Sequence, residues 1–334
     1  MEVGCLFPPG TQTPAHIEQA EALGYRRALV YDSPAFLADP WITLALAAGR
    51  TSDISLGVCA ITPRLRHVVS TAGALATLAT LAPGRVEVVV GSGFTSQLML
   101  GQRPARWSEV EAYAAALRTL LAGRETEWDG AIIGLKHGAL CGVRLPAEVT
   151  IRIAAHGPRG YAAAGRLGSG IVTNVSHRGS NAGPADMACV QVLYYGTVLD
   201  AGESLASERV KSAAGPYAAF QLHIGSHGIA HDAPERAAFS RAVARIDERR
   251  RHLEIHRGHL IELTEWERPL ISADLIARTT GTGTAEEVRA HLAGIAASGA
   301  QGVLYGPMGP DIPRELATFA AAAGTRSPGA AAGP

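Results

Sequence analysis

The stretch that decides the fold is VTIRIAAHGPRGYAAAGRLGSGIVTN, residues 149–174, which reads as a strand, a turn, a helix and a second strand. Residues 150–155 form a short apolar run with β-branched side chains, as a buried parallel strand requires, and Gly157-Pro158 ends that run. Pro158 suits the first helical position because its missing N–H costs nothing there and its φ is already helical. Residues 170–174 then return as a second apolar strand, so we expect one βαβ unit.

Polar groups gather where the two strands of this unit end. The free N–H groups of the first helical turn, with the positive end of the helix dipole, point out beside His156 and Gly157. Thr173 and Asn174 finish the second strand, and both can bond a phosphate oxygen. Many βαβ units bind nothing, so the stretch alone is consistent with a phosphate site or with a purely structural unit. It is not the dinucleotide fingerprint, because no G-x-G-x-x-G follows a strand with an acidic residue about 20 residues on.

The composition limits the classes of function. The 334 residues carry 30 basic and 30 acidic side chains, which are interspersed and give a net charge of zero. No basic patch predicts nucleic-acid binding, and no segment approaches the roughly 20 apolar residues that span a bilayer. The first residues, MEVGCLFPPG, lack an export signal, so we expect a cytoplasmic protein without membrane or nucleic-acid partners. The 4 cysteines are scattered, which favours reduced thiols over disulfides or a zinc site.

Strand-like and helix-like segments alternate along the whole chain. We expect strands at 1–7, 27–32, 54–61, 86–90, 150–155, 170–174, 217–224 and 302–306. Besides the helix of the opening unit, we expect helices at 14–23, 41–50, 70–81, 107–122, 184–204, 234–260, 285–297 and 311–323, and a hairpin at 127–135. Eight strand-then-helix units in order argue for a closed parallel barrel rather than an open doubly wound sheet.

The expected fold is therefore α/β, a single (β/α)8 TIM barrel with insertions over residues 1–323, followed by a flexible tail at 324–334. In such barrels, function belongs at the C-terminal ends of the strands.

The residues at those strand ends resemble a known family. The similarity is carried, in chain order, by Ala22-Leu23-Gly24-Tyr25, Val30-Tyr31-Asp32, Asp39-Pro40-Trp41, ISLGVCAITP at 54–63, Arg66-His67, Leu81-Ala82-Pro83-Gly84-Arg85, Gly91-Ser92-Gly93, IAAHGP at 153–158, Ala164-Gly165-Arg166-Leu167-Gly168 and Gly309-Pro310-Asp311-Ile312. This ordered set resembles the bacterial luciferase-like superfamily of flavin- and deazaflavin-dependent oxidoreductases. It looks most like the branch that uses coenzyme F420, which includes methylenetetrahydromethanopterin reductase and the deazaflavin-dependent glucose-6-phosphate dehydrogenases.

The resemblance implies a cofactor site, residue by residue. The segment that holds the cofactor's phosphate is matched by Ala155, His156, Gly157, Pro158, Thr173 and Asn174. The end of the third strand, residues 57–60, matches a bulge where the family has a non-proline cis peptide against the ring, so the cis bond would be Cys59–Ala60. Gly91 and Gly93 match the glycines after the fourth strand, and Asp32 matches an acidic residue near the ring edge. Asp32 and its neighbour Ser33 are the catalytic candidates.

Two positions depart from the family's pattern. The sugar-phosphate dehydrogenases place a histidine after that aspartate, where this chain has Ser33. They and several reductases follow the glycines of the fourth strand with an acidic residue, where this chain has Phe94. The acid/base pair that would deprotonate an alcohol is therefore missing, which favours reduction or oxygenation of a more apolar substrate.

Three functions are consistent with this resemblance. The first is an F420-dependent oxidoreductase that transfers a hydride between the deazaflavin and a small organic substrate, acting as a reductase. The alternative is an FMN-dependent luciferase-like monooxygenase, and the third is a barrel that binds a flavin without catalysis. We also expect a homodimer, because the helices at 41–48 and 70–81 are apolar over much of their surface and family members usually pair through such helices.

One group of histidines has a spacing typical of metal ligands. His252, His256 and His259 recur on one face of the helix expected at 234–260. That helix should lie on the outside of the barrel, so we favour a subunit contact for these side chains and expect no metal.

A second group follows the strand expected at 217–224. His223, His227 and His231 would lie on the catalytic rim, either facing the substrate or as solvated loop residues. Cys59 is expected to pack beneath the ring rather than to act as a nucleophile, since nothing near it in the sequence lowers its pKa.

Overall fold

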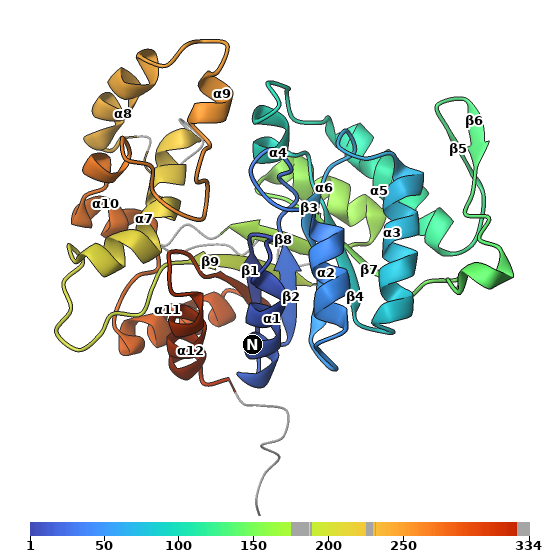
Figure 1. The fold of residues 1–334 in the computed structure, drawn as a ribbon, viewed down its shortest axis with the longest axis horizontal. Helices are drawn as coiled ribbons and strands as arrows, with labels where there is room; N and C mark the ends of the chain where they lie inside the picture. The colour runs from blue at the N-terminus through green and yellow to red at the C-terminus, as the bar shows by residue number, and fades with distance from the viewer. Residues whose placement is uncertain (175–186, 188, 225–229, 231, 326–334) are drawn as a thin grey trace, which may run out of the picture.

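The computed structural model describes residues 1–174, 187, 189–224, 230 and 232–325 (Figure 1). Eight parallel strands close into a barrel in the order β1-β10-β9-β8-β7-β4-β3-β2. The barrel strands are β1 (Glu2–Phe7), β2 (Arg27–Val30), β3 (Ser55–Ile61), β4 (Val86–Val90), β7 (Thr150–Ala154), β8 (Ile171–Asn174), β9 (Val190–Tyr195) and β10 (Gly302–Gly306). The predicted TIM barrel is thus confirmed.

Helices surround the barrel. They are α1 (Thr13–Ala22), α2 (Pro40–Ala48), α3 (Val68–Leu81), α4 (Phe94–Leu98), α5 (Trp107–Leu121), α6 (Pro158–Leu167), α7 (Glu208–His223), α8 (Glu235–Ala244), α9 (Arg251–Glu254), α10 (Ala273–Thr279), α11 (Ala285–Ala297) and α12 (Ile312–Ala323), with short 3-10 turns η1 (Ala139–Cys141) and η3 (Arg268–Leu270). Figure 1 shows α8 and α9 standing apart from the barrel on one side, and a hairpin of β5 (Thr126–Trp128) and β6 (Ala131–Ile133) projecting on the other. Among the described residues no helix is long and apolar enough to cross a membrane.

The interior of the barrel is layered. Its lower layer is charged: Glu87 is 3% exposed and forms ion pairs with Arg27, at 3.2 Å, and with Arg152. Gly4 makes room for this layer, because a Cβ there would lie 2.1 Å from Cγ of Arg27. The next layer towards the strand ends is apolar and consists of Leu6, Leu29, Cys59, Val89, Val172 and Leu304. The alternate side chains of each strand pack outwards against the helices, as the two-residue period of a strand requires.

Local signals set the helix starts. Asp39 caps α2, since its carboxylate accepts from the backbone N–H groups of Trp41 and Ile42, and Pro40 occupies the first helical position. Thr284 and Glu287 form a reciprocal capping box at the start of α11. These polar residues end the preceding loops and fix where each helix packs on the barrel.

The predicted helix at 184–204 is wrong over its described part, because residues 190–195 form strand β9. This run, VQVLYY, is rich in β-branched and aromatic residues and pairs in parallel with β8 and β10. Burial on both faces removes the polar alternation that would have revealed a strand.

The predicted strand at 217–224 is also wrong, because residues up to His223 lie in α7. Ser207 caps this helix by accepting from the N–H of Val210, and ten of its residues are buried. Burial around most of the helix hides its 3.6-residue period and leaves an apparent alternation near its end.

The long helix predicted at 234–260 is broken into α8, a turn, α9 and a second turn. Asp247 favours the first turn because its carboxylate accepts from the N–H of Arg249, a local bond that competes with the helix. Gly258 and Leu260 have φ values of 75° and 57°, which end the helical path after α9. The exposed position expected for His256 is wrong as well, since this residue is 6% exposed.

The predicted hairpin at 127–135 is confirmed as β5 and β6. Asp129 and Gly130 form its turn with φ values of 49° and 80°, as a two-residue hairpin turn requires. The flexible tail predicted at 324–334 lies almost wholly outside the described residues and stays a prediction.

Candidate functional site

The residues implicated by the sequence lie at the C-terminal ends of five barrel strands that are consecutive in space, β2, β3, β4, β7 and β8. Asp32 follows β2, Cys59 and Ala60 end β3, and Gly91 and Gly93 follow β4. The remaining residues, Ala155 to Pro158 with Thr173 and Asn174, lie at the ends of β7 and β8. The barrel therefore brings these segments, separated by up to about 140 residues in the chain, onto one arc of its mouth. We call this arc, from β2 to β8, the cofactor arc.

Gly157 lies at one end of this arc, where the sequence predicts a phosphate site; we call the start of α6 with the end of β8 the phosphate seat. It is the N-cap of α6 in extended conformation, and Pro158 occupies the first helical position as predicted. A Cβ built on Gly157 meets no atom within 4 Å, so the space above the helix start is open to a ligand. The free N–H groups of the first turn and the positive dipole end face this space, which suits an anion.

His156 is tied to the neighbouring strand. Its Nδ1 accepts a hydrogen bond of 3.2 Å from the backbone N–H of Asn174, so the neutral ring carries its proton on Nε2 and can donate it outwards. Oδ1 of Asn174 is buried and has no partner among the described residues. Thr173 is 1% exposed, and its hydroxyl lies 3.4 Å from that of Tyr161. An orphaned amide and an outward ring donor thus flank the helix start.

Two residues next to the helix start differ in their exposure to solvent. Ala155 is fully buried, and its N–H donates to the carbonyl of Val172, so it joins β7 to β8. Arg159, which sequence reasoning missed, is exposed at the start of α6, with no recorded hydrogen bond or ion pair among the described residues. Its place directly after His156-Gly157-Pro158 is a signal that could have identified it as a phosphate ligand.

The end of β3 has the local geometry that the family resemblance implies. The Cys59–Ala60 peptide bond is cis, and the pairing of β3 with β4 shifts between Cys59 and Ile61. Gly91 lies beside it, since a Cβ on Gly91 would be 3.3 Å from that of Ala60. Burial raises the pKa of the Cys59 thiol to about 12, so it stays a neutral packing group.

Gly93 begins α4 in the left-handed region, with φ of 79°. A Cβ there would lie 2.6 Å from Cγ2 of Thr62, so the position needs glycine for its conformation and for its contact. Phe94 follows and is 38% exposed. The resembled branch is expected to have an acidic residue at this position, whereas this chain exposes the aromatic ring of Phe94.

Asp32 is a buried carboxylate at the other end of the arc. It is 2% exposed, and neither oxygen has a hydrogen-bond partner among the described residues. Nε of Arg66 lies 3.6 Å from Oδ2 of Asp32, while the same guanidinium donates to Asp39 at 2.7 Å. Burial raises the pKa of Asp32, and Arg66 partly offsets that rise.

Ser33 contributes its backbone to the turn after β2. Its carbonyl accepts from the N–H groups of Phe36 and Leu37, and its hydroxyl has no recorded partner among the described residues. The turn places this hydroxyl next to Asp32 in the chain, but nothing activates it as a base.

The other arc of the mouth, from β9 through β10 to β1, is mainly apolar and aromatic. Tyr195 ends β9, and its hydroxyl lies 3.1 Å from that of Tyr31, which follows β2. Tyr195 also stacks on Tyr217 of α7, with ring centroids 4.2 Å apart. Sequence reasoning missed this cluster because it placed Tyr195 in a helix and Tyr217 in a strand.

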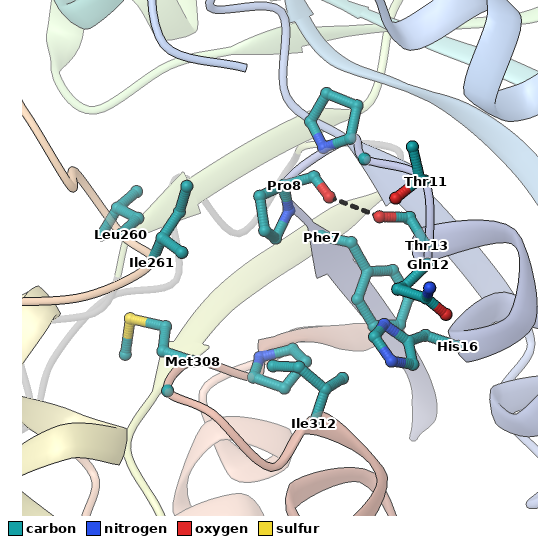
Figure 2. Close-up of a pocket in the computed structure, with 14 residues that line it drawn as sticks. Phe7, Pro8, Thr11, Gln12, Thr13, His16, Leu260, Ile261, Met308 and Ile312 are labelled. Carbon is teal, nitrogen blue, oxygen red and sulfur yellow. Dashed lines mark hydrogen bonds between the residues drawn. The ribbon is translucent and has the colours of Figure 1, made fainter. Parts of the chain in front are cut away.

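A cavity of about 300 Å³ opens at the rim of this second arc. Figure 2 shows Leu260, Ile261 and Met308 on one side of it and Pro8, with Thr13 bonded to its carbonyl, on the other. Leu260 and Met308 also pack with Tyr195 and Tyr217. None of the residues predicted to hold the phosphate lines this cavity, and Leu260 and Met308 connect its wall to the aromatic cluster of Tyr195 and Tyr217.

The histidines predicted on the rim lie elsewhere. His223 ends α7, and its Nε2 lies 2.6 Å from a carboxylate oxygen of Glu267. Both residues belong to the segment from α7 to α10 beside the barrel, which we call the helical lobe (Figure 1). His227 and His231 lie outside the described residues.

Comparisons with known proteins agree with this geometry. Residues 8–302 match the family model described as luciferase-like monooxygenase. The chain is 36% identical over 142 residues to F420-dependent glucose-6-phosphate dehydrogenase of Beutenbergia cavernae, covering 40% of each chain. It is 29% identical over 143 residues to 5,10-methylenetetrahydromethanopterin reductase of Methanolobus tindarius, covering 42% of this chain and 43% of that one. The matched part is thus about two fifths of these relatives' length.

Solved structures share the fold across the whole chain. The coenzyme F420 dependent tetrahydromethanopterin reductase from Methanopyrus kandleri superposes with a TM-score of 0.70 at 18% identity, covering 96% of this chain and 98% of that one. The oxygenating constituent of 3,6-diketocamphane monooxygenase from Pseudomonas putida, in complex with FMN, has a TM-score of 0.57 at 13% identity, covering 96% and 97%. At these identities the likeness concerns the fold alone.

Proposed function

The chain belongs to the luciferase-like monooxygenase family, and from that premise we propose that it is an F420-dependent oxidoreductase. It would transfer a hydride between the deazaflavin and a small organic substrate, with reduction of the substrate as the favoured direction. The observation that carries this proposal is the cofactor arc, on which an open helix start after β7, the bulged end of β3 and a buried carboxylate after β2 follow one another around the mouth of the barrel.

The residues of the arc fit a phosphate-bearing flavin-type cofactor. The space at Gly157 is open, and the buried Oδ1 of Asn174 and both carboxylate oxygens of Asp32 have no hydrogen-bond partner among the described residues. Buried polar groups without partners are costly and are expected to meet a ligand. His156, Gly157 and Asn174, with Arg159, would hold the phosphate, and Ala60 with Gly91 would support the ring.

The choice of F420 over FMN rests on the relatives. Those matched at 36% and 29% identity are described as F420-dependent or as a methylenetetrahydromethanopterin reductase, whereas an FMN complex appears among folds at 13% identity. FMN remains the alternative because both cofactors present a phosphate and a planar ring. An oxygenase would use the same seat and shelf.

The bound deazaflavin would supply hydride chemistry, and the chain would bind, orient and move protons. The hydroxyls of Tyr31 and Tyr195 lie at the border of the cofactor arc and are held neutral by burial. The hydroxyl whose proton is not used within the pair could protonate one atom of the substrate's double bond while the other atom of that bond receives the hydride. Leu260 and Met308, which pack against Tyr195, line the neighbouring cavity, and Phe94 exposes an aromatic ring after β4. Such walls suit an apolar acceptor better than a sugar phosphate.

A titration of the purified protein tests this proposal. Fluorescence-monitored additions of F420 and, separately, of FMN should give saturable binding of F420 that is at least tenfold tighter than that of FMN. Tight FMN binding without a response to F420 would replace the proposal by the monooxygenase alternative. Cofactor binding without turnover on a broad panel of enones, imines and carbonyl compounds would instead support a non-catalytic flavin-binding barrel.

We also propose a homodimer, from the exposed apolar side chains of two outer helices. Ile42 and Leu46 of α2 are 66% and 58% exposed, and Leu81 at the end of the neighbouring α3 is 53% exposed. Large apolar side chains gathered on two adjacent outer helices support a surface that is covered by a second copy.

A further inference from the structure

Three histidine side chains meet in the helical lobe beside the barrel. His223 ends α7, and His256 and His259 lie on the turn that follows α9. One ring nitrogen of each lies within 4.8 Å of those of the other two. The centroid of the His256 ring is 5.5 Å from that of His223 and 5.4 Å from that of His259. Two segments more than 30 residues apart in the chain thus converge on one point.

The three imidazoles are buried, and each has an unused nitrogen. His256 is 6% exposed, and the side chain of His223 is 2% exposed. The Nδ1 atoms of all three lack a hydrogen-bond partner among the described residues. Burial is the main cause that lowers the pKa of His256 to about 3 and that of His259 well below its usual value, and repulsion from the neighbouring histidines lowers both pKa values further. The rings of His256 and His259 are therefore neutral at physiological pH, the form in which imidazole binds metals.

Glu267 fixes the orientation of one ring. Its Oε1 lies 2.6 Å from Nε2 of His223, and its Oε2 accepts from the N–H of Thr264 at 3.1 Å and from the hydroxyl at 2.5 Å. The carboxylate therefore keeps the proton on Nε2, so the lone pair of Nδ1 is available to the cluster. Glu267 is 2% exposed, and His223 is its only ion-pair partner among the described residues. A cation on the far side of the ring would compensate this buried negative charge.

We propose that His223, His256 and His259 bind a divalent first-row transition cation, best matched by zinc, with Glu267 as the outer-shell partner of His223. Carboxylate–histidine–metal arrangements of this kind orient metal ligands in many proteins, and three neutral imidazoles are a donor set that zinc accepts. Nitrogen ligands at about 2.0–2.1 Å in a tetrahedral site lie roughly 3.3 Å apart, so the widest pair has to close by about 1.5 Å. Rotation of the three side chains supplies such a movement.

The position of the cluster indicates a structural role. The ion would join the end of α7 to the turn after α9, and Leu260, the residue after His259, packs with Tyr195 and Tyr217 and lines the rim cavity. Cation binding would therefore hold the wall of the cavity in place without touching the cofactor arc. The site is thus independent of which cofactor the arc binds.

Cobalt and zinc titrations of the untagged, EDTA-treated full chain test this proposal. We expect one Co²⁺ per chain with the intense visible absorption of a tetrahedral nitrogen site, displacement of that signal by Zn²⁺, and a higher thermal midpoint with either ion. If the parent protein shows no such cobalt spectrum, that result alone contradicts the proposal. The three histidines would then be a packed cluster without a metal.

Variants locate the ion. His256→Gln and His223→Gln should each weaken Zn²⁺ binding by at least about 100-fold, and Glu267→Gln by roughly 10- to 100-fold, whereas His137→Gln, at an exposed position near the hairpin, should bind as the parent does. Circular dichroism checks that each variant is folded. Unchanged affinity in folded His256→Gln would place the ion elsewhere and overturn the assignment.

Discussion

The hydroxyl oxygens of Tyr31 and Tyr195 lie 3.1 Å apart and join the ends of β2 and β9, which are not neighbours in the barrel. Burial raises the pKa of both hydroxyls, so the pair is protonated at neutral pH. Tyr195 also stacks on Tyr217 at an interplanar angle of 17°, which restricts its rotation. One hydroxyl of the pair donates to the other, so the pair fixes one free proton donor where the cofactor arc meets the apolar arc.

Tyr195→Phe should lower kcat by roughly 100-fold, because it removes a positioned proton donor while keeping the aromatic stack. KM and F420 affinity should change little, since the ring remains in place. Steady-state kinetics with a substrate found by panel screening provide the measurement. Tyr217→Phe, which keeps the stack and the Tyr31–Tyr195 contact, should have a much smaller effect. An unchanged kcat in Tyr195→Phe would remove the pair from the mechanism.

Gly157→Val should weaken cofactor binding at least tenfold, or about 1.4 kcal/mol, because the new side chain enters the open space at the start of α6. The extended backbone of Gly157 accepts valine without strain, so the variant should fold. Fluorescence titration gives the affinity. Gly165→Val, at an exposed position of the same helix with equally open surroundings, is the matched control and should bind normally. Equal affinity of Gly157→Val and the parent would mean that the phosphate lies elsewhere.

Asn174→Leu probes the opposite side of the seat. It removes the amide whose Oδ1 is buried without a partner, and it keeps the backbone N–H that donates to His156. Affinity should fall by a smaller factor than in Gly157→Val, because the one charge-assisted hydrogen bond that the Nδ2 group of this amide would donate to the phosphate is worth roughly 1.5–3 kcal/mol at most and water can replace part of it. The same titration measures the effect, and tighter binding in Asn174→Leu would exclude a polar contact at this position.

The first half of the chain and the opening βαβ unit were predictable because their signals are local. Pro158 at a helix start, the Asp129-Gly130 turn and the β-branched run of β4 each act through nearest neighbours in the chain. The cis bond at Cys59–Ala60 was predictable only by resemblance, since no local propensity favours a non-proline cis peptide.

The helical lobe was not predictable for the opposite reason. Most residues of α7 are buried, as are those of the barrel strand β9 that precedes it. The polar face that distinguishes a helix from a strand is therefore missing in both segments. The histidine cluster depends on contacts between α7 and the turn after α9, which no spacing within one segment encodes. The i, i+4, i+7 pattern grouped His256 with His259 correctly, but it included His252 in place of His223.

Glu203 provides a test of stability against pH. Arg209 donates to Glu203 at 2.8 Å, and this hydrogen bond is the main cause that lowers the pKa of Glu203 to about 2, from 4.5. A folded pKa below the unfolded one means that the stabilisation is complete above pH 4.5 and is lost as the pH falls towards 2. Glu203→Gln should therefore lower the free energy of unfolding by about 1–3 kcal/mol at pH 7.

Urea unfolding at several pH values measures this effect. The difference between the parent and Glu203→Gln should shrink between pH 4.5 and 2, because protonation then removes the same charge from the parent. Glu125→Gln, which breaks an exposed ion pair with Lys136, is the control and should leave the unfolding midpoint nearly unchanged at all pH values. A difference that stays constant with pH would show that the carboxylate's charge is not the stabilising feature.

The exposed apolar surface of α2 and α3 gives the last test. Ile42 and Leu46 are one helical turn apart, so both face outwards from the same side of α2. Light scattering should give about 69 kDa for the parent, twice the chain mass of 34.7 kDa, since a C2 interface covers the same patch on both copies. Ile42→Glu places two like charges near the symmetry axis and should shift the mass towards that of one chain at micromolar concentration.

Leu140→Glu, at a fully exposed leucine in η1 outside this surface, should leave the dimer intact. A parent mass near 35 kDa would contradict the dimer, because it would mean that no second copy covers these leucine and isoleucine side chains.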